Sequence, residues 1–84
     1  MEYIIDCAAL ATPKEFHAAL KQALNLPEWY GGNLDALYDC LTQLNAGTKL
    51  RLVGFDTLGS FSRGFRRVME DACTDNPNFR VIFC

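Results

Sequence analysis

Histidine, a common residue of metal centres and catalytic sites, is scarce in this sequence. Its 84 residues include one histidine, His17, among apolar neighbours. No CxxC pair occurs, and no cysteine has a histidine at metal-ligand spacing. Cys40 beside Asp39 is not a recognisable nucleophile–base pair. Two carboxylates at Asp35 and Asp39, without further ligands, make a poor metal site. We therefore expect no metal, no cofactor and no catalytic residue, and a protein that is not an enzyme.

Long hydrophobic runs and targeting features are also missing. No apolar run approaches the ~18 residues of a membrane span. The N-terminal residues have no basic flank and no long apolar stretch, so a signal peptide is not supported. We expect a cytoplasmic protein with no membrane partner. In that compartment the cysteines are expected to be free thiols, mostly half-buried. They are Cys7, Cys40, Cys73 and Cys84.

Positive charge is missing from one long segment. The net charge is only −2, but Glu28, Asp35 and Asp39 follow Asn25 with no basic residue before Lys49. Phosphate binding needs clustered lysine or arginine, so nucleic acid is not the expected partner. A chain of this length has one core, and we expect a single domain over residues 1–84.

The pattern of apolar and turn residues predicts alternating strands and helices. Thr12, Pro13 and Glu15 form a helix-start signal with a capping box, and Asn33 is a plausible N-cap for a second helix. A third helical region is expected from Asp56 or Thr57 to about Cys73, with a break possible at Gly59 or Gly64. Apolar runs predict strands over residues 3–7, 49–53 and 79–83. The remaining helices are expected over residues 13–24 and 34–44, the latter closed by Asn45-Ala46-Gly47.

This β-α-α-β-α-β order predicts an α/β fold with a parallel sheet, because each gap between strands is long enough for a helical crossover. In the second helix, helical spacing places four leucines on the buried side, Leu34, Leu37, Leu41 and Leu44. The opposite side is polar and comprises Asp35, Tyr38, Asp39 and Thr42.

The segment of residues 26–41 is the most informative part of the chain. Trp29 and Tyr30 precede a Gly31-Gly32 turn, and Tyr38 follows between Asp35 and Asp39 on one helix face. Ordinary structural roles also fit: Asp35 favours the helix dipole, and the two loop aromatics could cover the core. Taken together, aromatic anchors beside unpaired charges are typical of a protein-binding surface.

This segment resembles the barstar family, intracellular inhibitors of the secreted bacterial ribonuclease barnase. Its sixteen residues read Leu-Pro-Glu-Trp-Tyr-Gly-Gly-Asn-Leu-Asp-Ala-Leu-Tyr-Asp-Cys-Leu, which follows the family pattern nearly residue for residue. Elsewhere the resemblance continues in outline over the whole chain. It implies a three-stranded parallel sheet with helices packed on it.

The resemblance also implies the site and the partner. The second helix and its preceding loop would plug a ribonuclease active site, with Asp39 in place of the RNA phosphate and Asp35 at the rim. Trp29 would stack near the enzyme's catalytic histidine. In the last helix Asp71 would add an acidic contact, with Asp75 one turn on. The surroundings would be filled by Tyr30, Asn33, Tyr38 and Thr42.

Departures from the family pattern leave the choice of enzyme open. Position 32 is glycine where barstar is acidic, position 38 is tyrosine instead of tryptophan, and position 44 is leucine instead of tryptophan. The chain after the second strand is shorter, so the family's small third helix could be trimmed. We expect a basic ribonuclease of secreted or toxin type as the partner of a monomeric inhibitor. The alternative is an immunity or adaptor module that binds a basic non-ribonuclease protein through the same surface.

Overall fold

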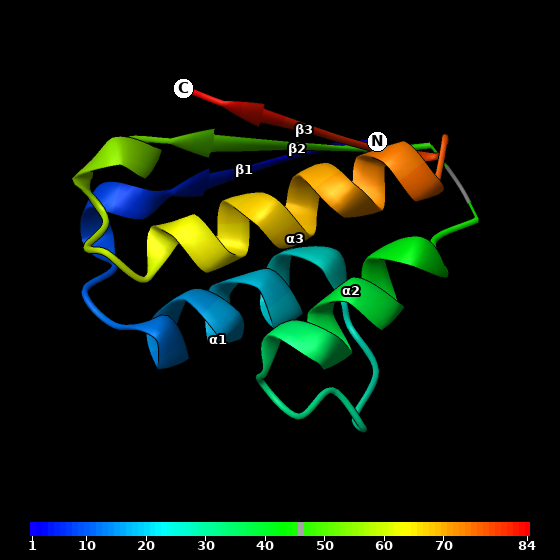
Figure 1. Ribbon diagram of the computed structural model, residues 1–84, viewed down its shortest axis with the longest axis horizontal. Helices are drawn as coiled ribbons and strands as arrows, with labels where there is room; N and C mark the ends of the chain where they lie inside the picture. The colour runs from blue at the N-terminus through cyan, green and yellow to red at the C-terminus, as the bar shows by residue number, and fades with distance from the viewer. Residues whose placement is uncertain (46) are drawn as a thin grey trace.

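Three parallel strands form one sheet, and the helices pack on one of its faces (Figure 1). The computed structural model describes residues 1–45 and 47–84. The elements are β1 Glu2–Asp6, η1 Cys7–Ala9, α1 Pro13–Leu24, α2 Leu34–Thr42, β2 Thr48–Val53, η2 Phe55–Thr57, α3 Ser62–Asp75 and β3 Phe79–Phe83, where η marks a 3₁₀ turn. This order and the parallel pairing of the strands confirm the predicted α/β fold.

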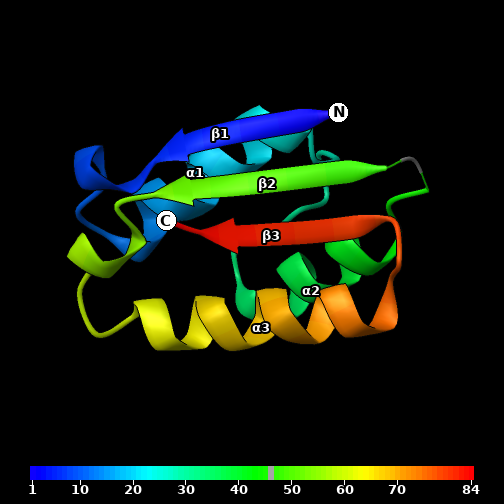
Figure 2. The same cartoon turned by 90° about the horizontal axis from the view of Figure 1, so that it is seen from above.

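The sheet buries one side of each strand and leaves the other side open. Its order is β1-β2-β3, with β2 in the centre. Leu50 and Leu52 of β2 are fully buried, whereas Ile4 of β1, in register with Arg51, is 64% exposed. Figure 2 views the sheet from this uncovered side, with the helices behind it. The apolar core therefore lies between the sheet and the helical layer.

The predicted capping box starts α1. Thr12 Oγ1 accepts a hydrogen bond from the Glu15 backbone N–H at 3.2 Å, and Glu15 Oε1 accepts one from the Thr12 N–H at 3.2 Å. Phe16 and Leu20 of this helix are completely buried. The helix ends at Asn25, whose positive φ of 53° is the left-handed C-cap conformation.

The third helical region is interrupted, as the glycines suggested. Instead of one helix from residue 56 to 73, the chain forms the short η2 turn, leaves helical geometry at Leu58, and begins α3 at Ser62. The break therefore lies near Gly59, while Gly64 is inside the helix. α3 also runs two residues further than expected, to Asp75.

The prediction that α2 extends to Leu44 is wrong. The helix ends at Thr42, and Leu44 is half-buried outside it. The physical reason is Asn76, whose Nδ2 donates to the carbonyl oxygens of Leu41 at 2.8 Å and Leu44 at 2.9 Å. These bonds satisfy terminal carbonyls that would otherwise need a longer helix or water. Ala46, part of the predicted helix stop, lies outside the described residues.

Candidate partner-binding surface

The N-terminal half of α2 presents two carboxylates to solvent. Asn33 caps the helix, because its Oδ1 accepts a hydrogen bond from the Ala36 N–H at 2.8 Å. Leu37 is fully buried and fixes the rotation of the helix about its axis. Asp35 and Asp39, one turn apart, are consequently both exposed.

Tyr38 connects this face to the C-terminal half of α3. Its hydroxyl donates a hydrogen bond to a carboxylate oxygen of Asp75. That hydrogen bond is the main reason why the pKa of Tyr38 is raised, and the negative charges of Asp75, Asp71 and Asp39 raise it further. The phenol therefore lies within a group of aspartates from two helices. We call Asp35, Asp39, Asp71 and Asp75 the acidic surface.

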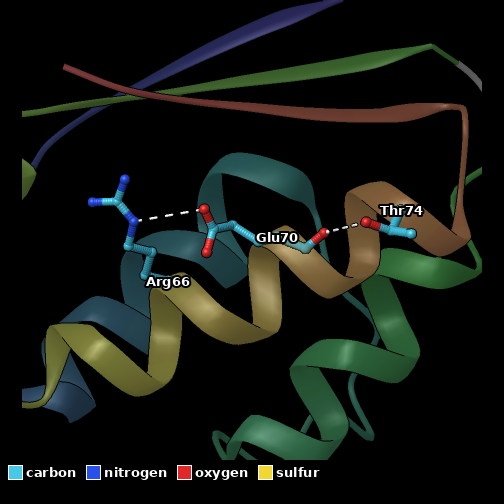
Figure 3. A network of polar contacts seen from close by, with 3 residues as sticks. All are labelled: Arg66, Glu70 and Thr74. Carbon is cyan, nitrogen blue, oxygen red and sulfur yellow. Dashed lines mark hydrogen bonds and ion pairs between the residues drawn. The ribbon is translucent and has the colours of Figure 1, made fainter.

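No basic side chain neutralises the acidic surface within the described residues. The ion pairs among the described residues lie elsewhere: Arg51 pairs with Glu2 at 3.3 Å, and Arg66 pairs with Glu70 at 3.7 Å. Figure 3 shows the second pair on α3, where the Glu70 carbonyl also accepts a bond of 3.2 Å from Thr74 Oγ1. Glu70 is thus paired along its own helix, while its neighbour Asp71 adds to the charge around Tyr38.

The two aromatic residues of the preceding loop have opposite environments. Trp29 is 57% exposed. It borders a shallow recess of about 190 Å³ that Pro27, Cys40 and Leu44 also line. An exposed tryptophan next to an apolar recess is the kind of anchor that protein interfaces favour.

Tyr30, by contrast, is only 6% exposed and belongs to the core. Its hydroxyl is hydrogen-bonded to Nδ1 of His17, which is itself 8% exposed. Burial raises the pKa of Tyr30 and lowers the pKa of His17, so both groups are neutral near pH 7. Tyr30 thus takes the core-covering role that the sequence left open, and it supports the loop from beneath.

Thr42 and Asn33 use their polar atoms within the helix. Thr42 Oγ1 donates to the carbonyl oxygens of Tyr38 at 2.9 Å and Asp39 at 3.1 Å. Asn33 is exposed with its carbonyl oxygen committed to the cap, while Thr42 is half-buried. Both residues flank Asp35 and Asp39 and hold the helix that carries them.

Asn76 is a structural residue of the site that the sequence did not reveal. It is 5% exposed and joins the end of α3 to the end of α2 through the two bonds described above. In the sequence it stands in Asp75-Asn76-Pro77-Asn78, which indicates only a turn. No local pattern could signal partners more than 30 residues away.

The remaining chemistry of the described residues is sparse. No group of three or more His, Cys, Asp or Glu side chains there could hold a metal ion. All four cysteines are free thiols, with Cys7 and Cys40 buried and Cys84 exposed. Within residues 1–45 and 47–84, no helix has the length and apolarity to cross a bilayer.

Comparisons with known proteins agree with this architecture. The family model described as Barstar (barnase inhibitor) matches residues 1–83. A protein of Bacillus subtilis (strain 168) named "Putative ribonuclease inhibitor YrdF" is 36% identical over 85 residues, covering 94% of this chain and 93% of that protein. A match over almost the full chain, together with the parallel sheet and helix order, settles the family: the chain belongs to the barstar family.

Proposed function

We propose that the protein inhibits a barnase-like microbial ribonuclease by inserting the acidic surface into the enzyme's active site. The observation that carries this proposal is the group of four aspartates on α2 and α3, which has no basic partner within the described residues. Membership of the barstar family, whose description names barnase inhibition, supports the same role.

Asp39 is the group that we assign to the phosphate position. It is exposed, in the second turn of α2, where the helix dipole stabilises a carboxylate less than it does at Asp35. A ribonuclease active site is a basic cleft shaped for an RNA phosphate, and a carboxylate on a rigid helix can replace that charge. Asp39 thus satisfies the cationic groups of the enzyme without offering a bond to cleave, and the protein itself is not an enzyme.

The other surface residues extend the contact around Asp39. Asp35 and Asp71 meet basic groups at the rim of the cleft, while Trp29 supplies the exposed apolar anchor. Tyr38 holds Asp75 in place from α2. We assign Tyr30, Asn33 and Thr42 to the same site as residues that shape the loop and the helix. The partner is a secreted or toxin-type basic protein, and the free inhibitor is a cytoplasmic monomer.

The test is inhibition of RNA cleavage by a panel of barnase-like ribonucleases, with Asp39→Asn as the decisive variant. Losing one partner of a buried charge pair costs about 2–5 kcal/mol, a range set partly by the barnase–barstar complex, the type example of this family. We expect the inhibition constant to rise by at least about thirtyfold, since 2 kcal/mol is about this factor.

Asp56→Asn is the matched control, because Asp56 is an exposed carboxylate of η2, outside the acidic surface. It should leave inhibition within about twofold. If no ribonuclease of the panel is slowed at micromolar inhibitor, the proposal is wrong. Capture of a basic non-ribonuclease protein that Asp39→Asn releases would instead identify an immunity or adaptor module.

A further inference from the structure

A pocket lies between α1 and the loop that carries Trp29 and Tyr30, and none of the four aspartates lines it. Its volume is about 500 Å³, within the range of small-ligand sites. α1 contributes Lys14, His17 and Lys21, which recur along one helix face at spacings of three and four residues. The loop contributes Tyr30, Gly31 and Gly32.

The two lysines give this pocket an unneutralised positive charge. Neither has a carboxylate within ion-pair distance in the part of the chain that the structure describes. Lys14 is exposed, Lys21 is half-buried, and both line the pocket.

His17 adds a hydrogen-bond donor from beneath. The imidazole is more than nine-tenths buried and lines the pocket. When the Tyr30 hydroxyl donates to Nδ1 of His17, the phenol proton has an acceptor and Nδ1 has a donor. The proton of the neutral imidazole is then on Nε2, which has no hydrogen-bond partner among the described residues. Among the described residues, Arg51 Nε is the one fully buried polar side-chain atom that has no hydrogen-bond partner. Because His17 Nε2 also has no partner, it is not fully buried and keeps contact with solvent.

Gly32 keeps the pocket open. Its φ is +70°, and a Cβ atom at this residue would lie 3.9 Å from Cβ of His17. A side chain at position 32 would therefore extend over the imidazole and the pocket.

We infer that this pocket binds an anionic group, a phosphate or a carboxylate, between the ammonium groups of Lys14 and Lys21 and the Nε2–H of His17. Charge-assisted hydrogen bonds from such donors are the strong class of polar contact. The apolar walls formed by Pro13 and Ala18 would cover the body of the molecule that carries the anion. The pocket shares Tyr30 with the proposed ribonuclease-binding site but is lined by none of the four aspartates, so anion binding is tested without any ribonuclease.

The single histidine gives a direct readout. We would titrate the whole chain with inorganic phosphate at constant pH and follow the His17 Hε1 signal by NMR, against sodium chloride of equal ionic strength. A saturable shift with a Kd on the order of 1 mM is expected. A parallel titration with N-acetyl-aspartate amide distinguishes a protein carboxylate from a free phosphate as the source of the anion.

Variants then locate the binding. The double variant Lys14→Gln, Lys21→Gln should weaken binding about fivefold or more, and Lys49→Gln, on the open face of the sheet, should leave it unchanged. The inference fails if chloride moves the His17 signal as much as phosphate and N-acetyl-aspartate amide do. It also fails if the double variant and Lys49→Gln bind phosphate with equal affinity.

Gly32→Asp and Gly32→Asn form a second, matched pair. Both residues tolerate a positive φ, and circular dichroism melting would show that both variants fold. Gly32→Asp should place a carboxylate beside the two lysines and weaken phosphate binding about fivefold more than Gly32→Asn does. An equal effect of the two variants would overturn the claim that charge controls this pocket.

Discussion

At the scale of single residues, the buried pair of His17 and Tyr30 shows how a polar contact supports a surface loop. Each side chain is less than a tenth exposed, and each would carry an unsatisfied polar atom without the other. The His17 ring also packs on Phe65, with ring centroids 4.8 Å apart. This pair therefore fixes the loop beneath Trp29 against both α1 and α3.

The pair predicts a specific dependence of stability on pH. Burial lowers the pKa of His17 below its ordinary 6.5, so the unfolded chain takes up a proton at a higher pH than the folded chain does. The stability contribution is fully present above about pH 6.5 and is lost as the pH falls through the lowered pKa of the folded state. We expect the free energy of unfolding by urea to decrease from pH 7.5 to pH 5.5.

His17→Gln is the control, because glutamine keeps a polar side chain but does not titrate. Its unfolding free energy should change less over the same interval, in which most carboxylates stay ionised. Parallel pH profiles of the two proteins would contradict the assignment of the effect to His17.

Tyr38 carries the second prediction at this scale. Its pKa is raised above 10, first by the hydrogen bond to Asp75 and then by desolvation and the surrounding aspartates. Asp75→Asn removes both the charged acceptor and one negative charge, so the Tyr38 phenol should ionise at a lower pH. Tyrosine Cζ signals in an NMR pH titration resolve Tyr38 from the other two tyrosines. Asp56→Asn should leave the Tyr38 midpoint in place, and an unmoved midpoint in Asp75→Asn would exclude the contact.

Helical spacing was enough to predict the exposure of Asp35 and Asp39, because a nine-residue amphipathic helix has one buried side. It could not predict which loop aromatic would be buried. Trp29 and Tyr30 are adjacent and both apolar, and the choice depends on His17, thirteen residues before Tyr30. The proximity of Tyr38 and Asp75 depends likewise on how α2 packs on α3, which no local pattern encodes.

At the scale of elements, local chemistry predicted the starts of α1 and α2, where the capping residues stand beside the helix they cap. The capping box of Thr12 and Glu15 and the Asn33 cap are confirmed. Helix ends were less predictable. α2 ends at Thr42 because Asn76, from another element, takes the carbonyls of Leu41 and Leu44.

The contact between Asn76 and the end of α2 predicts that a substitution of Asn76 strongly lowers stability. Asn76→Ala would remove the side-chain donor of the buried Leu41 carbonyl and leave the Leu44 carbonyl with only a long bond from Asn78. It should lower the unfolding free energy by about 2 kcal/mol or more. Thermal and urea unfolding measure the change.

Asn78→Ala is the matched control for that exchange. Asn78 is exposed, and its side chain makes one long bond of 3.4 Å to the Leu44 carbonyl. The control should cost less than about 0.5 kcal/mol, as surface exchanges usually do. Equal losses in the two variants would mean that Asn76 does not hold the end of α2.

At the scale of the whole molecule, the carboxylates of the acidic surface are separated from the basic side chains of the sheet. Lys49 and Arg80 lie in register on the open face of the sheet, whereas Arg51 on that face is paired with Glu2. The acidic surface lies on α2 and α3, and Figure 1 places α2 on the far side of α3 from the sheet. The net charge of −2 conceals this separation. A basic partner is therefore attracted to the acidic surface and repelled by Lys49 and Arg80.

That separation predicts how association with a basic ribonuclease depends on salt. Complementary charge raises association rates above the 10⁵–10⁶ M⁻¹s⁻¹ of uncharged encounters by about 10–10³-fold at low salt, in a set of complexes that includes barnase–barstar, the type pair of this family. The Debye length falls from about 10 Å at 0.1 M to about 3 Å at 1 M salt, so the attraction is screened. We expect the association rate to fall at least about tenfold between 50 mM and 1 M salt, measured by stopped-flow fluorescence of Trp29.

Variants that remove charge from the acidic surface or from the open face of the sheet test whether the position of a charge controls the association rate. The double variant Asp71→Asn, Asp75→Asn should flatten the dependence of the association rate on salt, because it removes half of the acidic surface. Lys49→Gln, on the opposite side, should leave that dependence unchanged or make it slightly steeper, since it removes a charge that repels the partner. If Lys49→Gln steepens the dependence half as much as the double variant flattens it, in proportion to one charge against two, association responds to net charge alone. The placement of the aspartates on α2 and α3 would then add nothing to the rate.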